Sequence, residues 1–474
     1  MSAARPAAER SSALHRLLIV TAPLLATALA LAAVPAIQGA APPPRGQFGL
    51  SRLATGTGTP ASIKDFFLSS DCALCHPRQW SELDGSMHSV AHEDPLYRSF
   101  AELARREAGE EVYAYCSGCH SPAGVATGLI PRVAEEALPA EAKAGVTCDV
   151  CHTISELETT HGPWGEPGNA SFTLEAGRHK FGPLEEIERN PAHTGERRDF
   201  YQSAEFCASC HTIIHPLNGL RIEHTYEEWK ESVYAEKGIV CQDCHMRTVE
   251  DAIVVARTLQ KVPVTGTSAR KGAEHAIAPH FFVGGNADAD VLSGSRKHAT
   301  MAVERLKSAA TLELKVPPRA ASGSELAFDA VVTNVGAGHS LPTSLTELRE
   351  MWIHVRVLDG SGTLVFESGA LDAHGEIPEG TARFGAALHD AAGVYTFKPW
   401  EGTGFLWKRQ VPAKGSTTDT FRAPLPSAAR GPFAIEARLN YRTAPPHVIQ
   451  AVMGERAYTP KVVEMASARA EVGG

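Results

Sequence analysis

The N-terminal end of the chain carries its longest apolar stretch. Residues 17–34 are uncharged and mostly apolar, they follow a start that contains Arg5, Arg10 and Arg16, and small residues come after them. This order predicts a secretory signal peptide over residues 1–36 that is removed from the mature protein. The stretch is also long enough for a retained anchor helix, which stays open as an alternative. Residues 37–61, rich in Ala, Pro, Gly and Thr, are predicted to form a flexible linker.

The C-terminal part of the chain alternates apolar and polar residues with a period of two. Apolar residues occupy every second position over 312–316, 353–357 and 433–441, and turn residues such as those of 359–362 separate such stretches. This pattern predicts short antiparallel strands. Residues 306–474 are therefore expected to form an all-β, immunoglobulin-like sandwich domain, which contains no cysteine.

Residues 62–305 follow neither pattern over most of their length. Helices are predicted at 95–108 and 226–236, and Gly and Pro interrupt much of the remainder. The expected fold class is thus α+β with more than one domain, in which a mostly helical, irregular domain precedes the β-sandwich.

All ten cysteines lie in the irregular region, in five Cys-x-x-Cys-His motifs. In chain order, motifs 1 to 5 are Cys72/Cys75/His76, Cys116/Cys119/His120, Cys148/Cys151/His152, Cys207/Cys210/His211 and Cys241/Cys244/His245. This spacing is the attachment signature of c-type haem, in which two thiols form thioethers and the adjacent His is the proximal iron ligand. The sequence therefore predicts five covalently bound haem c groups, packed together to form much of the core of residues 62–305.

Other uses of Cys-x-x-Cys pairs do not explain the histidines. Tetrahedral zinc sites require no His directly after the second Cys. With 21 His in 474 residues, five such placements by chance have a probability on the order of one in ten million. A disulfide framework leaves the same histidines unexplained and is typical of much smaller chains.

The second axial ligand of each haem decides what the haem can do. The chain has seven Met, one of them the initiator; Met87 and Met246 lie closest to the motifs, but Met246 directly follows a proximal His and is badly placed to bind the same haem, whereas further His residues are plentiful in the haem region. These are His88, His92, His161, His179, His193, His215, His224, His275, His280 and His298. Mostly bis-His ligation is predicted, which gives lower reduction potentials than Met/His ligation.

Ten candidates are too many for five sites, so some must be ordinary histidines. Local sequence favours His88 soon after motif 1, His161 before Gly and Pro, His193 upstream of motif 4, and His280 ahead of a Gly pair. A fifth candidate, His339, lies between Gly338 and Ser340-Leu341-Pro342 in the β domain. It is either an exposed histidine of a tight hairpin or a ligand that the β domain donates to the last haem.

The net charge and the expected cellular compartment limit the kinds of molecule that the protein can bind. The formal net charge is −9, and haem propionates make the holoprotein more negative, which disfavours nucleic-acid binding and suits transient docking with basic patches of redox proteins. Haem c is attached outside the cytoplasm. We therefore expect the mature protein in the periplasm, or exported to the outer surface, with a possible membrane association through its N-terminal segment.

The chain resembles the cytochrome c-554-like multihaem cytochromes over roughly residues 65–300. The resemblance is carried by the residues around the motifs: Cys72-Ala-Leu-Cys75-His76 with Trp80 and Ser86-Met87-His88, Gly145-Val-Thr-Cys148-Asp-Val-Cys151-His152, Glu205-Phe-Cys207-Ala-Ser-Cys210-His211 and Gly238-Ile-Val-Cys241-Gln-Asp-Cys244-His245-Met246. It implies stacked and perpendicular haem pairs, and it supports His88 and His161, and more loosely His193 and His280, as distal ligands. The fifth haem and the β domain lie outside the c-554 template, although the β domain resembles a C-terminal module of some multihaem cytochromes.

Two functions remain open on these grounds. The first is an electron carrier, as in anaerobic respiration, between partners such as a quinol-oxidising membrane complex, dehydrogenases and terminal reductases. The alternative is a haem-dependent oxidoreductase that acts on a small nitrogen or sulfur species at one five-coordinate haem. Pentahaem nitrite reductases use a Cys-x-x-Cys-Lys motif that is missing here, which counts against nitrite ammonification. A minor third reading is a structural subunit of a larger cytochrome assembly.

Overall fold

The computed structural model describes residues 46–158, 167–185, 190–267, 274–275 and 277–474, without the side chains of 274 and 275. Residues 39–474 form one compact unit. The predicted signal peptide over residues 1–36 and the distal-ligand candidate His161 both lie outside the described residues.

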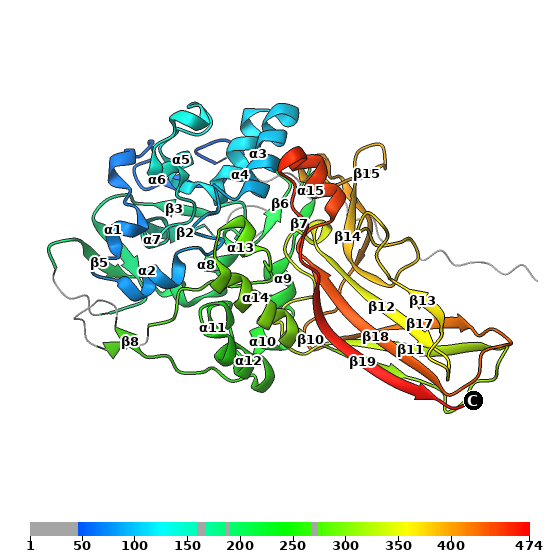
Figure 1. Cartoon of the computed structure of the whole chain (residues 1–474). Coiled ribbons are helices and arrows are strands. Elements are labelled where there is room, and N and C mark those ends of the chain that lie inside the picture. Colours follow the sequence, from blue (N-terminus) through cyan, green and yellow to red (C-terminus); the bar gives the residue numbers. More distant parts are fainter. Residues whose placement is uncertain (1–45, 159–166, 186–189, 268–273, 276) are drawn as a thin grey trace, which may run out of the picture. The chain divides into compact units, whose positions relative to one another are not determined.

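The part of the unit before Ala310 consists of short helices, very short strands and irregular segments (Figure 1). Its helices are α1 (Ser69–Cys72), α2 (Pro77–Leu83), α3 (Pro95–Ala108), α4 (Glu110–His120), α5 (Pro122–Ala126), α6 (Ala140–Lys143), α7 (Cys148–His152), α8 (Ala204–Ala208), α9 (Thr225–Lys230), α10 (Val233–Glu236), α11 (Gln242–His245), α12 (Val249–Thr258), α13 (Ala289–Leu292) and α14 (Arg296–Ala309). Its strands are β1 (Ala54–Thr55), β2 (Ile154–Leu157), β3 (Phe172–Leu174), β4 (His179–Gly182), β5 (Thr194–Arg197), β6 (Ile213–Ile214), β7 (Arg221–Glu223), β8 (Gly266–Thr267) and β9 (Glu274–His275).

This region is less helical than the sequence predicts. The helix predicted at 95–108 is confirmed by α3, which Asp94 caps by accepting a hydrogen bond from the Leu96 N–H. The helix predicted at 226–236 is instead two helices, α9 and α10. The break occurs because the Ser232 side chain caps the first turn of α10 and thereby ends the preceding helix.

Residues 46–61 are a correction to the predicted linker. Leu53 is fully buried and Leu50 is nearly so, and β1 pairs in parallel with β3. The Ala, Pro, Gly and Thr residues around them hid these two apolar anchors, so composition alone gave the wrong expectation for this segment.

The part after residue 309 is β-rich, with ten strands and one helix among the described residues. These are β10 (Ala310–Lys315), β11 (Glu325–Asn334), β12 (Glu350–Leu358), β13 (Leu364–Ser368), β14 (Arg383–His389), β15 (Tyr395–Thr396), β16 (Gly404–Arg409), β17 (Ser416–Pro424), β18 (Phe433–Arg442), α15 (Pro446–Met453) and β19 (Val463–Val472). One sheet has the order β10-β11-β17; the other has the order β15-β14-β12-β18-β19, with β13 on β12 and β16 on β14. The strands predicted at 312–316, 353–357 and 433–441 are confirmed as β10, β12 and β18.

The two sheets share one hydrophobic core. In β12, Ile353, Val355 and Val357 are fully buried, as are Ile435 of β18 and Val332 of β11. These positions alternate with polar residues, so period two places every second side chain against the opposite sheet. The core therefore follows directly from the sequence pattern.

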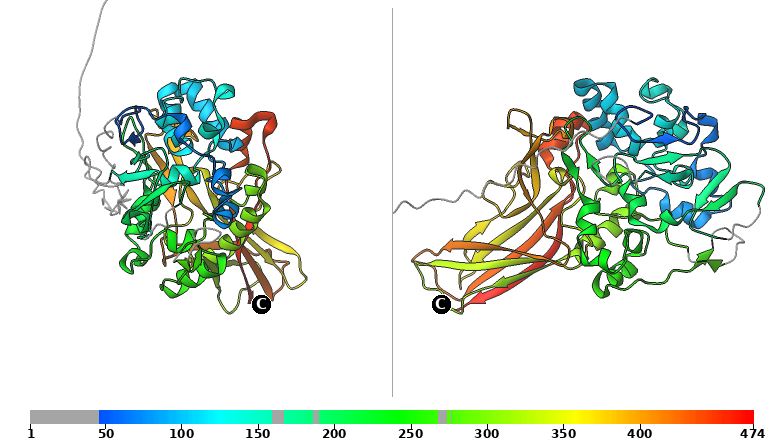
Figure 2. Two further views of the ribbon diagram at one scale, coloured as in Figure 1. Left: turned by 90° about the vertical axis from the view of Figure 1, so that its left-hand side faces the viewer. Right: turned by 180° about the vertical axis from the view of Figure 1, so that it is seen from behind.

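The β-rich part is joined to the haem-motif region without a linker. Helix α14 runs directly into β10, and Leu306 and Ala309 of α14 belong to the β core. At another point α15 packs on α3, with Ile449 and Met453 against Leu96, and the views in Figures 1 and 2 agree on this contact. The β strands are thereby held against the region that carries the motifs.

No helix among the described residues has the length and apolar character required to cross a bilayer.

The shared β core gives a stability prediction. Ile435→Ala removes a fully buried side chain and should lower the free energy of unfolding by about 2–5 kcal/mol. The exposed Thr418→Ala on β17 is the matched control, with an expected change within about 0.5 kcal/mol. Urea unfolding of the haem-loaded protein followed by circular dichroism measures both, and equal effects would contradict the placement of the core.

Candidate functional site: a cavity lined by five haem-attachment motifs

Each motif folds into one helical turn. In motifs 1, 4 and 5 the His N–H donates to the carbonyl of the first Cys, at 2.8, 3.0 and 2.9 Å, while motifs 2 and 3 lie in α4 and α7. Residues four apart in a helix lie on one face. The first Cys and the His of every motif therefore face the same side, as haem attachment requires, and all ten cysteines are free of disulfides.

All five motifs line one cavity of about 2160 Å³. Single ligand pockets span about 300–1,000 Å³, so this space suits several large groups. Its lining includes every cysteine and every proximal His of the motifs, together with His88, His193, His215, His280 and His339. It also includes Arg247 and Arg305, whose buried Nε atoms have no hydrogen-bond partner in the described part of the chain. The residues present thus fit haem, since guanidinium groups are suited to its propionates.

The proximal imidazoles are oriented by hydrogen bonds at Nδ1. His120, His152 and His245 contact the carbonyl oxygens of Ala91, Phe181 and Val283 at 2.8, 2.6 and 2.8 Å. A bond at Nδ1 fixes the tautomer in which Nε2 carries the free lone pair that binds a metal. In addition, the Tyr97 ring stacks on His120 with centroids 3.7 Å apart.

Three proximal imidazoles face a second imidazole at one recurring distance. Ring centroids lie 6.2 Å apart for His76 and His193, 6.0 Å for His211 and His88, and 6.3 Å for His245 and His339. A metal–nitrogen bond of about 2.0 Å, plus roughly 1.1 Å to the ring centre, places the centroids of two opposed imidazole ligands about 6.2 Å apart. The three pairs are therefore spaced as two ligands of one iron.

The remaining two proximal imidazoles, those of His152 and His120, are not in pairs at this distance among the described residues. His280 lies close to His152, whose charge is the largest electrostatic contribution to its lowered pKa after burial. His120 has no paired imidazole among the described residues. The sequence candidate His161 falls in the part of the chain that is not described.

The candidate distal ligands differ in whether their Nε2 atom already contacts a protein oxygen. His193, His280 and His339 contact backbone carbonyls through Nδ1, at 3.3, 2.9 and 2.9 Å, and Nε2 stays available. Five other candidates use Nε2 in contacts with protein oxygens: His92 with Glu135, His179 with Glu196, His215 with Trp400, His224 with Arg221 and His298 with Glu82. These five are structural histidines in this fold. The side chain of the tenth candidate, His275, lies outside the description.

Burial favours the neutral form of four cavity histidines by lowering their pKa. It lowers the pKa of His88 and His245 to about 3 and that of His280 and His120 to about 4. A neutral imidazole is the form that binds metal. His211 is the exception: burial acts against its protonation, but the hydrogen bond with Glu223 and its charge raise the pKa to about 9.

Close backbone contacts hold the distal candidate His88 in place. Gly145, at a φ of +69°, passes so near His88 that a Cβ would lie 2.7 Å from the His88 carbonyl oxygen. Only glycine tolerates both that conformation and that approach. The neighbouring Val146 N–H donates to the same oxygen at 2.8 Å, so the segment before motif 3 fixes the backbone of His88.

The loop that carries His339 is bound to α9 by one carboxylate. Glu228 accepts hydrogen bonds from Thr343 Oγ1 at 2.6 Å, Ser340 N at 3.3 Å and Gln410 Nε2 at 2.7 Å. This contact joins the β-rich part to the helix that follows motif 4 in the chain. Glu228 therefore determines where the His339 ring lies relative to His245.

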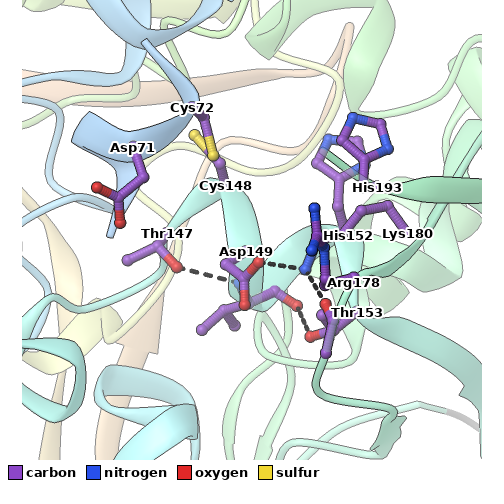
Figure 3. Close-up of polar contacts among 12 residues, drawn as sticks. Asp71, Cys72, Thr147, Cys148, Asp149, His152, Thr153, Arg178, Lys180 and His193 are labelled. Carbon is purple, nitrogen blue, oxygen red and sulfur yellow. Dashed lines mark hydrogen bonds and ion pairs between the residues drawn. The ribbon is translucent and has the colours of Figure 1, made fainter. Parts of the chain in front are cut away.

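Thiol contacts show which motifs are neighbours. Cys72 of motif 1 hydrogen-bonds Cys148 of motif 3, and the two thiols lie side by side in Figure 3. Similar contacts join Cys119 of motif 2 to Cys210 of motif 4, and Cys207 of motif 4 to Cys241 of motif 5. The charges of Cys151 and Cys210 also interact, which places motif 3 beside motif 4.

A buried ion pair anchors the junction of motifs 1 and 3. Lys180 donates to Asp149 within motif 3, and His152 and His193 lie close by (Figure 3). Burial raises the pKa of the Asp149 carboxyl, and the nearby ammonium group of Lys180 opposes that shift. The ion pair holds the β4 backbone, whose Phe181 carbonyl orients His152, against α7.

Several residues of the site were not foreseen from sequence. Glu223, Glu228 and Tyr97 contact histidines or their loops but belong to no motif, and only the fold brings them there. The one sequence signal was the short interval between motif 4 and Glu223, which suits a hairpin that returns to its start.

Comparisons with known proteins agree with this geometry. Residues 71–153 match the model of the family described as cytochrome c554 and c-prime. The structure is similar to a penta-heme cytochrome c552 from Thermochromatium tepidum, with a TM-score of 0.59 and 17% identity over 87% of this chain and 100% of that chain. A similarity to the CARDB domain of a Pyrococcus furiosus protein, with a TM-score of 0.17 and 13% identity over 35% and 85% of the two chains, carries no argument. No curated protein matches the sequence.

Fold and motifs together define a multihaem c-type cytochrome. Residues up to 309 make up less than 87% of the chain, so the fold shared with the Thermochromatium protein extends into the β-rich part. More closely, residues 71–153 are similar to the cytochrome c554 and c-prime family, and the fold is similar to that of a penta-heme cytochrome. The cofactor of this class is haem c, and its chemistry is haem-based electron transfer.

The clamp on the His339 loop gives a second prediction. Glu228→Ala removes the acceptor shared by Ser340, Thr343 and Gln410, which are partly buried, and each lost hydrogen bond to a charged group should cost about 1.5–3 kcal/mol. We expect the loop to loosen and a fraction of one haem per chain to become high-spin in the optical spectrum. The control is Glu231→Ala at the exposed end of the same helix. Identical low-spin spectra for both variants would contradict the clamp.

Proposed function

We propose that the protein is an electron carrier that holds five haem c groups, most of them between two histidines, and passes electrons between redox partners. The observation that carries the proposal is the spacing of three imidazole pairs at 6.0–6.3 Å inside one cavity that all five motifs line. Bound haem supplies reversible one-electron chemistry at iron. The chain supplies the attachment, the axial ligands and the exclusion of water.

The axial ligands follow from the pairs. The ten thiols attach the five haems, and His76, His120, His152, His211 and His245 are the proximal ligands. We assign His193 to motif 1, His280 to motif 3, His88 to motif 4 and His339 to motif 5. His161 is the proposed distal ligand of motif 2.

The neighbouring motifs set the order in which the haems are held. The thiol contacts give a path from motif 1 to motif 3 to motif 4, with motifs 2 and 5 both beside motif 4. Motif 1 is the end of this path, and its Leu74 and Cys75 are exposed. We propose that electrons enter or leave there and that motif 4 is the branch point.

The β-rich part has a defined role in this proposal. It is an immunoglobulin-like sandwich over residues 306–474 that donates His339 and serves as a docking platform, while residues 62–305 are the pentahaem domain. The Glu228 clamp supports this role because it binds the loop of His339 at Ser340 and Thr343, and a third residue of the β-rich part at Gln410, to the haem region.

The proposed setting is the periplasm or the outer cell surface, reached through a signal peptide over residues 1–36. The proposed partners are a quinol-oxidising membrane complex, dehydrogenases or terminal reductases, as in anaerobic respiration. The covalent attachment chemistry and the formal charge of −9 support this setting and transient docking with basic partners.

A second candidate function rests on motif 2. Among the described residues His120 forms no imidazole pair at 6.0–6.3 Å, and the imidazole whose charge acts on it most, that of His92, contacts Glu135 through Nε2. If His161 does not ligate there, the haem of motif 2 is five-coordinate, and the protein is an oxidoreductase for a small nitrogen or sulfur species.

The distal assignment is tested on the haem-loaded ferric protein. His193→Ala removes the ring opposite His76, so one haem of five should change from low-spin to high-spin in the EPR spectrum. The matched control is His179→Ala in the neighbouring strand, because the Nε2 of His179 contacts Glu196. High-spin haem in both variants, or in neither, would contradict the assignment.

A separate experiment distinguishes the two functions. We expect the wild-type protein to show five low-spin haems and His161→Ala to show one high-spin haem. One high-spin haem already in the wild type, unchanged by His161→Ala, would favour the oxidoreductase instead. Reduction of hydroxylamine, nitrite and sulfur oxyanions would then be measured.

A further inference from the structure

A buried carboxylate contacts the proximal histidine of motif 4. Oε1 of Glu223 lies 3.4 Å from Nδ1 of His211, and the Glu223 side chain is only 4% exposed. Thr225 Oγ1 donates to the same carboxylate oxygen at 3.2 Å. An ionised carboxylate in so dry a position interacts strongly with the few groups that it touches.

The hairpin after motif 4 places this carboxylate. Strands β6 and β7 are antiparallel, and Ile213 pairs with Glu223. Since Ile213 is two residues after His211, the chain leaves the motif, turns and returns Glu223 to the side of the imidazole. The hairpin is a local element, so the contact does not depend on distant segments.

Motif 4 differs in this respect from three other motifs. His120, His152 and His245 contact neutral backbone carbonyls through Nδ1, whereas His211 contacts a negative charge. A carboxylate at Nδ1 draws the proton of the imidazole and makes Nε2 a stronger donor to iron. A stronger donor and a nearby negative charge both favour ferric over ferrous iron and lower the reduction potential.

The lower reduction potential at motif 4 affects the path of electrons because motif 4 lies among several other motifs. Motif 4 lies beside motif 3 and touches motifs 2 and 5 through its two thiols. A haem of low reduction potential at such a point passes an electron to a neighbouring haem as soon as it receives one. Electrons then rest on the outer haems, and more than one can be stored without blocking the branch.

We propose that Glu223 is a positioning residue that holds His211 as a strong donor and makes the haem of motif 4 lower in potential than those of motifs 2, 3 and 5. This inference rests on the proposed electron-carrier function and deepens it. The haem of motif 4, at the branch point, then passes electrons on and does not retain them.

The test is a spectroelectrochemical titration of the full-length, haem-loaded protein. Glu223→Gln keeps the size of the side chain and removes its charge, and we expect one of the five midpoint potentials to move upward while all five haems stay low-spin. The matched control is Glu367→Gln, which alters a carboxylate that contacts His354 in the β-rich part, outside the cavity lining. Its titration curve should coincide with that of the wild type.

Each result decides between the alternatives. Unchanged midpoints in a fully loaded Glu223→Gln protein overturn the role of Glu223 and leave the electron-carrier function intact. A wild-type protein that fails to bind five haems or to titrate reversibly contradicts the function itself. Should Glu223→Gln fail to load, Glu223→Asp replaces it: its carboxylate is one methylene further from Nδ1, so a smaller upward shift supports the role, and no shift overturns it.

Discussion

The haem-motif region depends on one recurring contact, in which the histidine of a motif faces an imidazole from a distant segment. The pairs at 6.0–6.3 Å join residues far apart in the chain: His76 meets His193, His88 meets His211, and His245 meets His339. A metal held between the two rings of such a pair would crosslink the segments that carry them. Such crosslinks would keep irregular segments in a fixed arrangement, as a conventional hydrophobic core does in other proteins.

The size of the cavity shows how much of the core belongs to the cofactors. The cavity of about 2160 Å³ is lined by the thiols and the proximal imidazoles of all five motifs. Without cofactors, the segments on its opposite sides have no apolar group between them to pack against, and burial of apolar surface is the main favourable contribution to folding. We therefore expect these segments to reach their arrangement together with the haems.

The sequence predicted the attachment sites and the β strands because both have local signatures. Five motifs identify themselves by spacing, and the alternation in 353–357 and 433–441 follows directly from the pleat of a strand. The distal ligands depend instead on which nitrogen of a histidine stays free. His215 and His298 are as buried as ligands would be, yet backbone carbonyls occupy their Nε2 atoms, and no sequence pattern reveals such contacts. The packed segment at Leu53 was missed because its composition resembles that of a linker.

The β-rich part, like the haem region, is held by contacts between segments that lie far apart in the chain. Its loop offers His339 to motif 5, and Glu228 fixes that loop from α9, two residues beyond Tyr226 in the helix that follows the β6–β7 hairpin. The same short segment carries Glu223 against His211 at its start. Residues 221–230 thus serve two neighbouring motifs, with one carboxylate acting on a proximal ligand and another on the loop of a distal one. A displacement of α9 against the β strands would therefore act on motifs 4 and 5 together, because one short segment carries both carboxylates.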